Sequence, residues 1–250
     1  MVTESQIILI DAGNTSIKYV GLDAVKTSLH TANSAKSCVQ ALRQYPRIAC
    51  IYLANVGDQS IEDQFRTFCN EIGITFRLIE TQKEQFSLLN AYSDVSKMGV
   101  DRWLAMLAAH EMTTQPFAVI DIGTAITCDF VKDGQHLGGW IAPGYGIMRD
   151  ALVKNTARVS ANSEIPTQFQ PGTDTEECVA MGCQAAVRGV YLSAVDYLSS
   201  NQTDFSVIIG GGGKNMLAFA QFDGSILVAN LVVHGLARYA RNDFPALVSE

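Results

Sequence analysis

The sequence has no cluster of lysine and arginine side chains, and no run approaches the roughly 18 apolar residues that suggest a membrane span. The formal net charge is −7 at pH 7, from 25 acidic and 18 basic residues. An acidic protein is repelled by a nucleic-acid backbone, because the two carry charge of the same sign. We therefore expect neither a nucleic-acid partner nor a membrane partner.

A secretory signal and a cysteine-based metal site are also missing. Residues 1–6 lack the basic stretch and the long apolar segment of a signal peptide. The six cysteines form no Cys-x-x-Cys pair and no Cys/His cluster at zinc spacing. These absences predict a cytoplasmic protein whose cysteines are reduced thiols.

What the chain does contain is a large apolar fraction, arranged in two similar halves. Hydrophobic residues occupy 48% of the 250 positions and charged residues 17%, so the chain can bury a substantial core. In each half the periodicity predicts a three-strand meander, followed by helices and strands. The strands expected in the first half are 7–10, 16–22, 27–31, 48–53 and 74–79, with helices at 35–45, 61–72 and 98–112. The strands expected in the second half are 117–122, 125–132, 136–141, 205–209 and 225–228, with helices at 146–158, 175–199, 215–221 and 231–242.

This duplication predicts an α/β protein of two domains with mixed sheets, over residues 1–115 and 116–250, and a cleft between them. Two local signals support the assignment. Gly73 is well placed to end the helix before it, and Asp133-Gly134 is a hairpin signal. The segment 159–172 is rich in small and polar residues, so we expect an exposed loop there.

One short motif occurs at corresponding points of both halves. Asp11-Ala12-Gly13-Asn14-Thr15-Ser16-Ile17-Lys18 follows the first apolar strand, and Asp121-Ile122-Gly123-Thr124-Ala125-Ile126-Thr127 follows the apolar strand of the second half. Glycine lets backbone N–H groups approach an anion, Asn and Thr add donors, and Asp can hold a cation or its water. Each motif alone could be an ordinary hairpin turn. Their recurrence favours a paired site for a nucleotide polyphosphate.

Three further segments extend this pattern, namely Gly99 to Arg102, Thr127 to Asp129 and Gly138 to Gly144. Together with the two phosphate motifs they resemble the type III pantothenate kinase family of the actin-like superfamily, in the family's order and over almost the whole chain. The resemblance implies ATP-dependent phosphorylation of pantothenate to 4'-phosphopantothenate, the first step of coenzyme A synthesis. It also implies two ribonuclease H-like (actin-like ATPase) domains with a nucleotide cleft. Two positions depart from the family: Ala12 stands where Ile is usual, and Gly210 to Gly213 replace a Thr-Gly-Gly beside the adenosine.

The resemblance also implies roles for single residues and a homodimeric assembly. Asp101 is the implied general base, Asp11 holds magnesium through water, and Asp121 holds a monovalent cation, K⁺ or NH₄⁺. The implied ATP contacts are Asp11, Ala12, Gly13, Asn14, Thr15, Ser16, Ile17, Lys18 and Thr124. The implied pantothenate contacts are Tyr92, Gly99, Val100, Asp101, Arg102 and Thr175.

Simpler interpretations of these residues stay open. An Asp such as Asp101 is favoured in any first helical turn, and Arg102 could pair with a nearby acid on the surface. Tyr92 could be a half-buried aromatic, and Thr175 lies in a segment typical of helix capping. For the whole chain, the alternatives are another actin-like kinase or polyphosphate hydrolase, or a regulatory protein that acts by binding. Four histidines match no family site and are expected at the surface or as satisfied core residues: His30, His110, His136 and His234.

Overall fold

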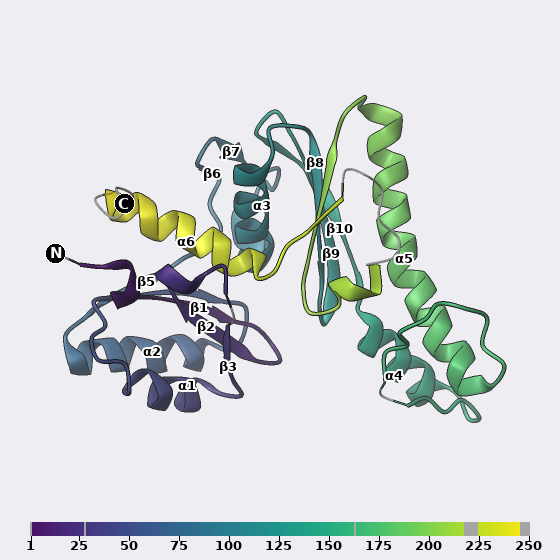
Figure 1. The fold of residues 1–250 in the computed structure, drawn as a ribbon, viewed down its shortest axis with the longest axis horizontal. Coiled ribbons are helices and arrows are strands. Elements are labelled where there is room, and N and C mark those ends of the chain that lie inside the picture. The colour runs from purple at the N-terminus through teal and green to yellow at the C-terminus, as the bar shows by residue number, and fades with distance from the viewer. Residues whose placement is uncertain (1, 28, 163, 218–224, 246–250) are drawn as a thin grey trace. The chain divides into compact units, whose positions relative to one another are not determined.

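The computed structural model of the protein describes residues 2–27, 29–162, 164–217 and 225–245 (Figure 1). The chain forms two compact units, residues 1–112 together with 229–250, and residues 113–228. These units differ from the predicted ranges of 1–115 and 116–250 in where the end of the chain belongs. The last helix, α6 (Leu231–Asp243), packs against α3 (Val100–Met112) and against the sheet of the first unit.

The first unit is built on a mixed sheet with the strand order β3-β2-β1-β4-β5. The strands are β1 (Ile7–Ala12), β2 (Ile17–Gly21), β3 (His30–Ala32), β4 (Cys50–Asn55) and β5 (Thr75–Leu78). β1 pairs antiparallel with β2 and parallel with β4, which in turn pairs parallel with β5. Since β1 has buried neighbours on both faces, its apolar run has no exposed surface.

Helices cover both faces of this sheet. α1 (Ala35–Leu42) and α2 (Gln59–Ile72) lie on one face, and α6 lies on the other (Figure 1). Side-chain caps fix the start of α1 and of α2. The hydroxyl oxygen of Ser34 accepts a hydrogen bond from the N–H of Ser37 at 3.1 Å. The carboxylate of Asp58 accepts one from the N–H of Ser60 at 2.8 Å. α2 ends at Gly73, whose φ of 70° confirms the predicted cap.

Short elements that the periodicity did not predict connect β5 to α3. They are β6 (Glu84–Gln85), β7 (Leu88–Leu89) and the 3₁₀ turn η3 (Val95–Lys97). β6 and β7 form a hairpin whose turn residues, Phe86 and Ser87, both have positive φ, 51° and 62°. Neither residue is a Gly, Asn or Asp, so the usual composition signal for such a turn was missing. Two further 3₁₀ turns precede β1 and follow β2: η1 (Glu4–Gln6) and η2 (Leu22–Ala24).

In the second unit, the strands lie in the order β12-β11-β8-β9-β10. They are β8 (Phe117–Ile122), β9 (Ala125–Lys132), β10 (Gln135–Pro143), β11 (Ser206–Gly210) and β12 (Ser225–Leu227). β8, β9 and β10 form the predicted antiparallel meander, and β11 joins β8 in parallel. Asp133 and Gly134, with φ values of 51° and 70°, confirm the predicted hairpin.

Two helices, α4 (Tyr145–Asn155) and α5 (Thr175–Asn201), pack in this unit together with the 3₁₀ turn η4 (Lys214–Leu217). No helix or strand interrupts the described part of the predicted loop 159–172. The predicted strand 27–31 and helix 215–221 are covered only in part, because residue 28 and residues 218–221 lie outside the described residues.

By length and composition alone, α5 could cross a membrane, in contrast to the expectation from sequence that no segment could. The core helix of a globular protein passes the same test. α5 contributes one buried face to the core of the second unit, where it packs beside β8 and β9. The buried apolar residues of that face are Val179, Ala180, Cys183, Val187, Tyr191, Ala194 and Leu198. That the protein has no membrane partner stays a prediction.

One position on this buried face is polar and unsatisfied. Gln184 is 0% exposed, and neither Nε2 nor Oε1 has a hydrogen-bond partner among the residues that the structure describes. Because burying an unpaired amide is unfavourable, we expect Gln184→Met, of similar size, to raise the free energy of unfolding by about 1 kcal/mol in urea denaturation. Gln184→Glu, which buries a charge at the same position, should lower it. An unchanged or lower stability of Gln184→Met would contradict the view that the buried amide destabilises the fold.

Candidate functional site

The first predicted phosphate motif forms the turn between β1 and β2. Asp11 lies opposite Lys18 in the antiparallel pair, so a carboxylate and an ammonium group flank the turn. The N–H of Gly13 donates to the carbonyl oxygen of Ser16 at 3.1 Å and closes the turn. The sequence therefore builds a short, hydrogen-bonded turn at the end of a buried strand.

Burial divides the residues of this turn into anchors and exposed groups. Ala12 and Ile17 have buried side chains, so only their backbone could meet a ligand. Asn14 and Thr15 are exposed at the tip, and Asp11 is partly exposed. Neutral donors are thus gathered at the tip, as binding of a polyphosphate requires.

The end of β4 lies beside this turn. β1 and β4 run parallel, and the N–H of Val56 donates to the carbonyl oxygen of Ala12 at 3.0 Å. The side chain of Asn55 shapes the loop after β4, because its Oδ1 accepts from the N–H of Gly57 at 3.0 Å. Ligands of α/β sheets bind outside the carboxyl ends of parallel strands, and the turn lies at such an edge.

The first turn of α3 carries the predicted base. Asp101 is partly exposed, and its Oδ1 accepts from the backbone N–H of Arg102 at 2.8 Å. The N-terminus of a helix stabilises a carboxylate through its unpaired N–H groups and its dipole. The neighbouring Val100 is buried, which fixes the start of the helix against the core.

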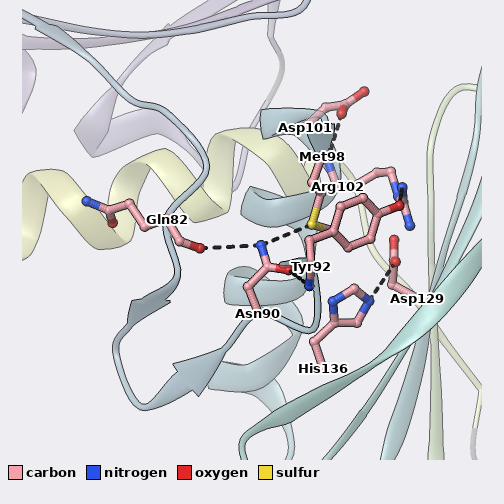
Figure 2. Close-up of polar contacts among 8 residues, drawn as sticks. All are labelled: Gln82, Asn90, Tyr92, Met98, Asp101, Arg102, Asp129 and His136. Atoms are coloured by element: carbon pink, nitrogen blue, oxygen red, sulfur yellow. Dashed lines mark hydrogen bonds and ion pairs between the residues drawn. The ribbon is translucent and has the colours of Figure 1, made fainter. Parts of the chain in front are cut away.

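Arg102 and Tyr92 meet within the first unit (Figure 2). The guanidinium group of Arg102 donates from Nη1 to the hydroxyl oxygen of Tyr92 at 3.0 Å and lies 5.7 Å from the centre of its ring. Arg102 is only 5% exposed, whereas Tyr92 is partly exposed. The structure therefore brings together two predicted substrate contacts that lie ten positions apart in the sequence.

The second predicted phosphate motif forms the turn between β8 and β9. The N–H of Gly123 donates to the carbonyl oxygen of Ala125 at 2.9 Å, and Asp121 lies opposite Thr127. Gly123 and Thr124 are exposed, and Asp121 is partly exposed. This turn repeats the design of the first one, with a carboxylate at the end of a buried strand.

Two glycine-rich segments pack their backbones against this turn. The N–H of Gly144 donates to the carbonyl oxygen of Thr124 at 2.9 Å, and that of Gly213 to the carbonyl oxygen of Ile122 at 2.8 Å. A Cβ atom on Gly144 would collide with the backbone oxygens of Gly123 and Thr124. The run Gly210 to Gly213 begins at the last residue of β11, which lies parallel to β8. These glycines therefore support the Asp121 turn, a role that their position in the sequence did not reveal.

Asp129 and His136 form a buried polar pair in the second unit (Figure 2). His136 Nε2 lies 3.0 Å from Asp129 Oδ1, with the two side chains 0% and 1% exposed. His136 lies opposite Val131 in the β9–β10 register, so its side chain shares a face of the sheet with Asp129, two positions before Val131. His136 is thus a core histidine with a polar partner, one of the two environments expected for it from the sequence, but spacing alone does not identify that partner.

Thr175 is the first residue of α5 and is exposed. The cap of this helix is made by its neighbours: Asp174 accepts from the N–H of Glu177 at 2.9 Å, and the N–H of Thr173 donates to the Glu177 carboxylate at 2.8 Å. Thr175 borders a surface hollow of about 580 Å³, together with Leu152 of α4, residues of the loop between α4 and α5, and other residues of α5. The side chain of Thr175 is thus placed where a ligand could reach it.

The candidate cation ligands, Asp11 and Asp121, belong to no cluster of metal-ligating side chains among the residues that the structure describes. Among the residues that the structure describes, no three His, Cys, Asp or Glu side chains gather into a metal-binding group. A cation at Asp11 or at Asp121 would complete its shell with water, backbone oxygens or oxygens of a bound phosphate. Mg²⁺ is bound in this way, because it prefers oxygen ligands and keeps several of its waters.

The close packing at Gly144 predicts a specific effect on stability. Gly144→Ala should push the β10 end away from the Asp121 turn and lower the thermal midpoint by several degrees, about 2 kcal/mol of stability. Gly146→Ala is the matched control, since a Cβ atom at that position on α4 meets no other atom within 4 Å. It should leave the midpoint unchanged or raise it, because alanine favours a helix. Equal effects of the two substitutions in a thermal melt would contradict the account.

Solved structures share this fold. A Campylobacter jejuni protein described as a Baf family transcriptional activator superposes with a TM-score of 0.65 at 21% identity, covering 96% of this chain and 100% of its own. A ROK family glucokinase from Streptomyces griseus superposes with a TM-score of 0.51 at 11% identity, covering 94% and 99%. At these identities the likeness shows the fold alone, and it confirms the predicted actin-like class with two mixed sheets.

Sequence relatives identify the family. The model of the type III pantothenate kinase family matches residues 7–196. A type III pantothenate kinase of Pseudoalteromonas atlantica is 36% identical over 96% of this chain and 99% of its own length. One from Colwellia psychrerythraea is 30% identical over 94% and 100%. The chain therefore belongs to the type III pantothenate kinase family.

Proposed function

We propose that the protein transfers the γ-phosphoryl group of ATP to the primary hydroxyl of pantothenate, giving 4'-phosphopantothenate and ADP. This is the first step of coenzyme A synthesis. The observation that carries the proposal is the first turn of α3. There a partly exposed carboxylate, Asp101, precedes a buried guanidinium group, Arg102, which is bound to Tyr92.

The acceptor end of the reaction is assigned to this turn. Arg102 and Tyr92 bind the pantothenate carboxylate, because a guanidinium fork matches a carboxylate in geometry and charge. Gly99, just before α3, and Val100, its first residue, contact the same substrate through the backbone. Thr175, exposed at the start of α5, is assigned a further pantothenate contact.

The chemical step then needs a proton acceptor. The oxygen of the primary hydroxyl attacks the γ-phosphorus, the bond from phosphorus to the β,γ-bridging oxygen breaks, and ADP leaves with that electron pair. Asp101 takes the hydroxyl proton. Its carboxylate is held in place by the N–H of Arg102, so its position is fixed before the substrate binds.

The phosphates of ATP are assigned to the two turns. The first turn offers backbone N–H groups, hydroxyls and an amide over residues 11–18, with Lys18 opposite Asp11. The second turn offers Thr124, with Asp121 at its strand end. Magnesium, held through water by Asp11, and K⁺ or NH₄⁺ at Asp121 would add positive charge that offsets the charge of the transferring group.

The proposal also includes the assembly and the location of the protein. A homodimer and a cytoplasmic location are carried over from the family.

Replacing the proposed base tests the function. Wild-type protein with ATP, Mg²⁺ and K⁺ should release ADP only when pantothenate is added. Asp101→Asn keeps the size of the side chain and its hydrogen-bond acceptor but cannot take a proton, so we expect kcat to fall about a hundredfold or more. The KM for ATP and the thermal midpoint should stay near the wild-type values.

Two controls separate the possible failures. Replacing K⁺ by Na⁺ should slow the wild-type enzyme if Asp121 holds a selective monovalent cation. ADP release without pantothenate would indicate a different acceptor or a hydrolase. No turnover under any of these conditions would overturn the kinase proposal, and a near-normal kcat for Asp101→Asn would remove the role of that residue alone.

A further inference from the structure

Tyr92 is positioned by its neighbour Asn90, which is buried to 1% exposure (Figure 2). Asn90 Oδ1 accepts from the backbone N–H of Tyr92 at 2.9 Å. Its Nδ2 lies 3.3 Å from both the carbonyl oxygen of Gln82 and Sδ of Met98. The side-chain amide of Asn90 therefore links Gln82, Tyr92 and Met98, which all belong to the segment that leads to α3.

Lys83 fixes the same segment from its other side. Its ammonium group donates to the carbonyl oxygens of Asn90 at 2.7 Å and of Tyr92 at 3.1 Å. The N–H of Asn90 donates in return to the carbonyl oxygen of Lys83 at 2.8 Å. Each strand of the β6–β7 hairpin is only two residues long. A hairpin this short is marginally stable by itself, so the hydrogen bonds of Lys83 and Asn90 stabilise its conformation.

The hydrogen bonds continue to the C-terminal helix. The hydroxyl of Tyr239 on α6 donates to Oε1 of Gln82 at 2.6 Å and accepts from Nε1 of Trp103 at 3.2 Å. The ring of Tyr239 also packs edge-on against Phe86 in the hairpin turn, with centroids 5.1 Å apart. Burial raises the pKa of Tyr239, so the hydroxyl keeps its proton at neutral pH and can serve as donor and acceptor together.

These contacts form a closed path. It starts at Trp103 on α3, crosses to Tyr239 on α6, passes through Gln82 and Asn90 to Tyr92, and returns to α3 at Arg102. Trp103 and Arg102 are adjacent in the sequence. Because the path is closed, a shift of residues 82–98 (the Tyr92 segment) relative to α3 must break at least one hydrogen bond.

We propose that Asn90 and Tyr239 are positioning residues of the pantothenate site, holding Tyr92 against the guanidinium group of Arg102. This inference rests on the proposed function of Arg102 and Tyr92 as the carboxylate site. Tyr239 lies outside residues 7–196, which the family model matches, so the match did not point to it. Neither residue needs to touch the substrate. Each acts by fixing groups that do.

Tyr239→Phe tests the path with little change in packing, because phenylalanine keeps the ring that meets Phe86 and removes only the hydroxyl. We expect the KM for pantothenate to rise about fivefold, with the KM for ATP nearly unchanged. Tyr52→Phe is the matched control. Tyr52 is fully buried on β4, and its hydroxyl donates at 2.8 Å to the carboxylate of Asp243. Asp243 lies on α6, as Tyr239 does, but this bond does not involve the Tyr92 segment.

A double-mutant cycle shows whether Tyr239 acts through Tyr92. Tyr92→Phe removes the hydroxyl that accepts from Arg102, so in that background Tyr239→Phe should raise the KM for pantothenate by less than about twofold. Asn90→Ala provides a second route, since it removes the bond to the Tyr92 backbone. It should raise the KM for pantothenate more than the KM for ATP.

These experiments distinguish failure of the positioning role from failure of the proposed kinase function. Wild-type protein that does not phosphorylate pantothenate overturns the proposed function itself. An active wild type in which Tyr239→Phe and Tyr52→Phe have the same kinetics overturns the positioning role. Fully additive effects of Tyr239→Phe and Tyr92→Phe overturn it as well, because they show that Tyr239 does not act through Tyr92.

Discussion

The close packing of α3 on α6 is the constraint on which the candidate site of the first unit depends. A Cβ atom on Gly235 would collide with the carbonyl oxygen of Leu104, so the two helices can approach this closely only because the residue is glycine. Arg238 reinforces the contact by donating to the carbonyl oxygen of Leu107 at 2.8 Å. α6 also covers β1, whose carboxyl end carries the first turn of the proposed phosphate site, and the neighbouring strand β4. The end of the chain thus joins the helix of the proposed base to the strand of the proposed phosphate site.

In the second unit, glycine residues and backbone hydrogen bonds hold the turn that follows Asp121 in place. Gly144 and Gly213 donate to the two sides of the turn that follows Asp121, which leaves Gly123 and Thr124 exposed at its tip. In both units a carboxylate stands at the end of a buried strand, beside a turn closed by one N–H bond. Rigid strands can position such groups more accurately than long loops, and phosphoryl transfer depends chiefly on accurate placement of charge.

Much of the fold could be predicted from local sequence patterns. Strands such as β1 and β8 begin with apolar runs that are typical of buried strands. Gly73 and Asp133-Gly134 occupy positions with positive φ, which these residue types tolerate. The two turns of the proposed phosphate site could be located in the same way. The supports of the site could not be predicted. Tyr239 lies 136 positions from Trp103, and no periodicity pairs residues at that distance. The contact between His136 and Asp129 could not be assigned either, because alternation places both side chains on one face of the sheet but does not say which neighbours on that face pair.

The central claim is that the first turn of α3 receives pantothenate, with its carboxylate on Arg102 and Tyr92 and its primary hydroxyl at Asp101. A crystal structure of the protein with bound pantothenate tests this most directly. The account predicts the substrate carboxylate within hydrogen-bond distance of the Arg102 guanidinium group, and the hydroxyl oxygen about 3 Å from the Asp101 carboxylate or joined to it by one water. Pantothenate bound elsewhere, or bound with its carboxylate away from Arg102, would contradict the account.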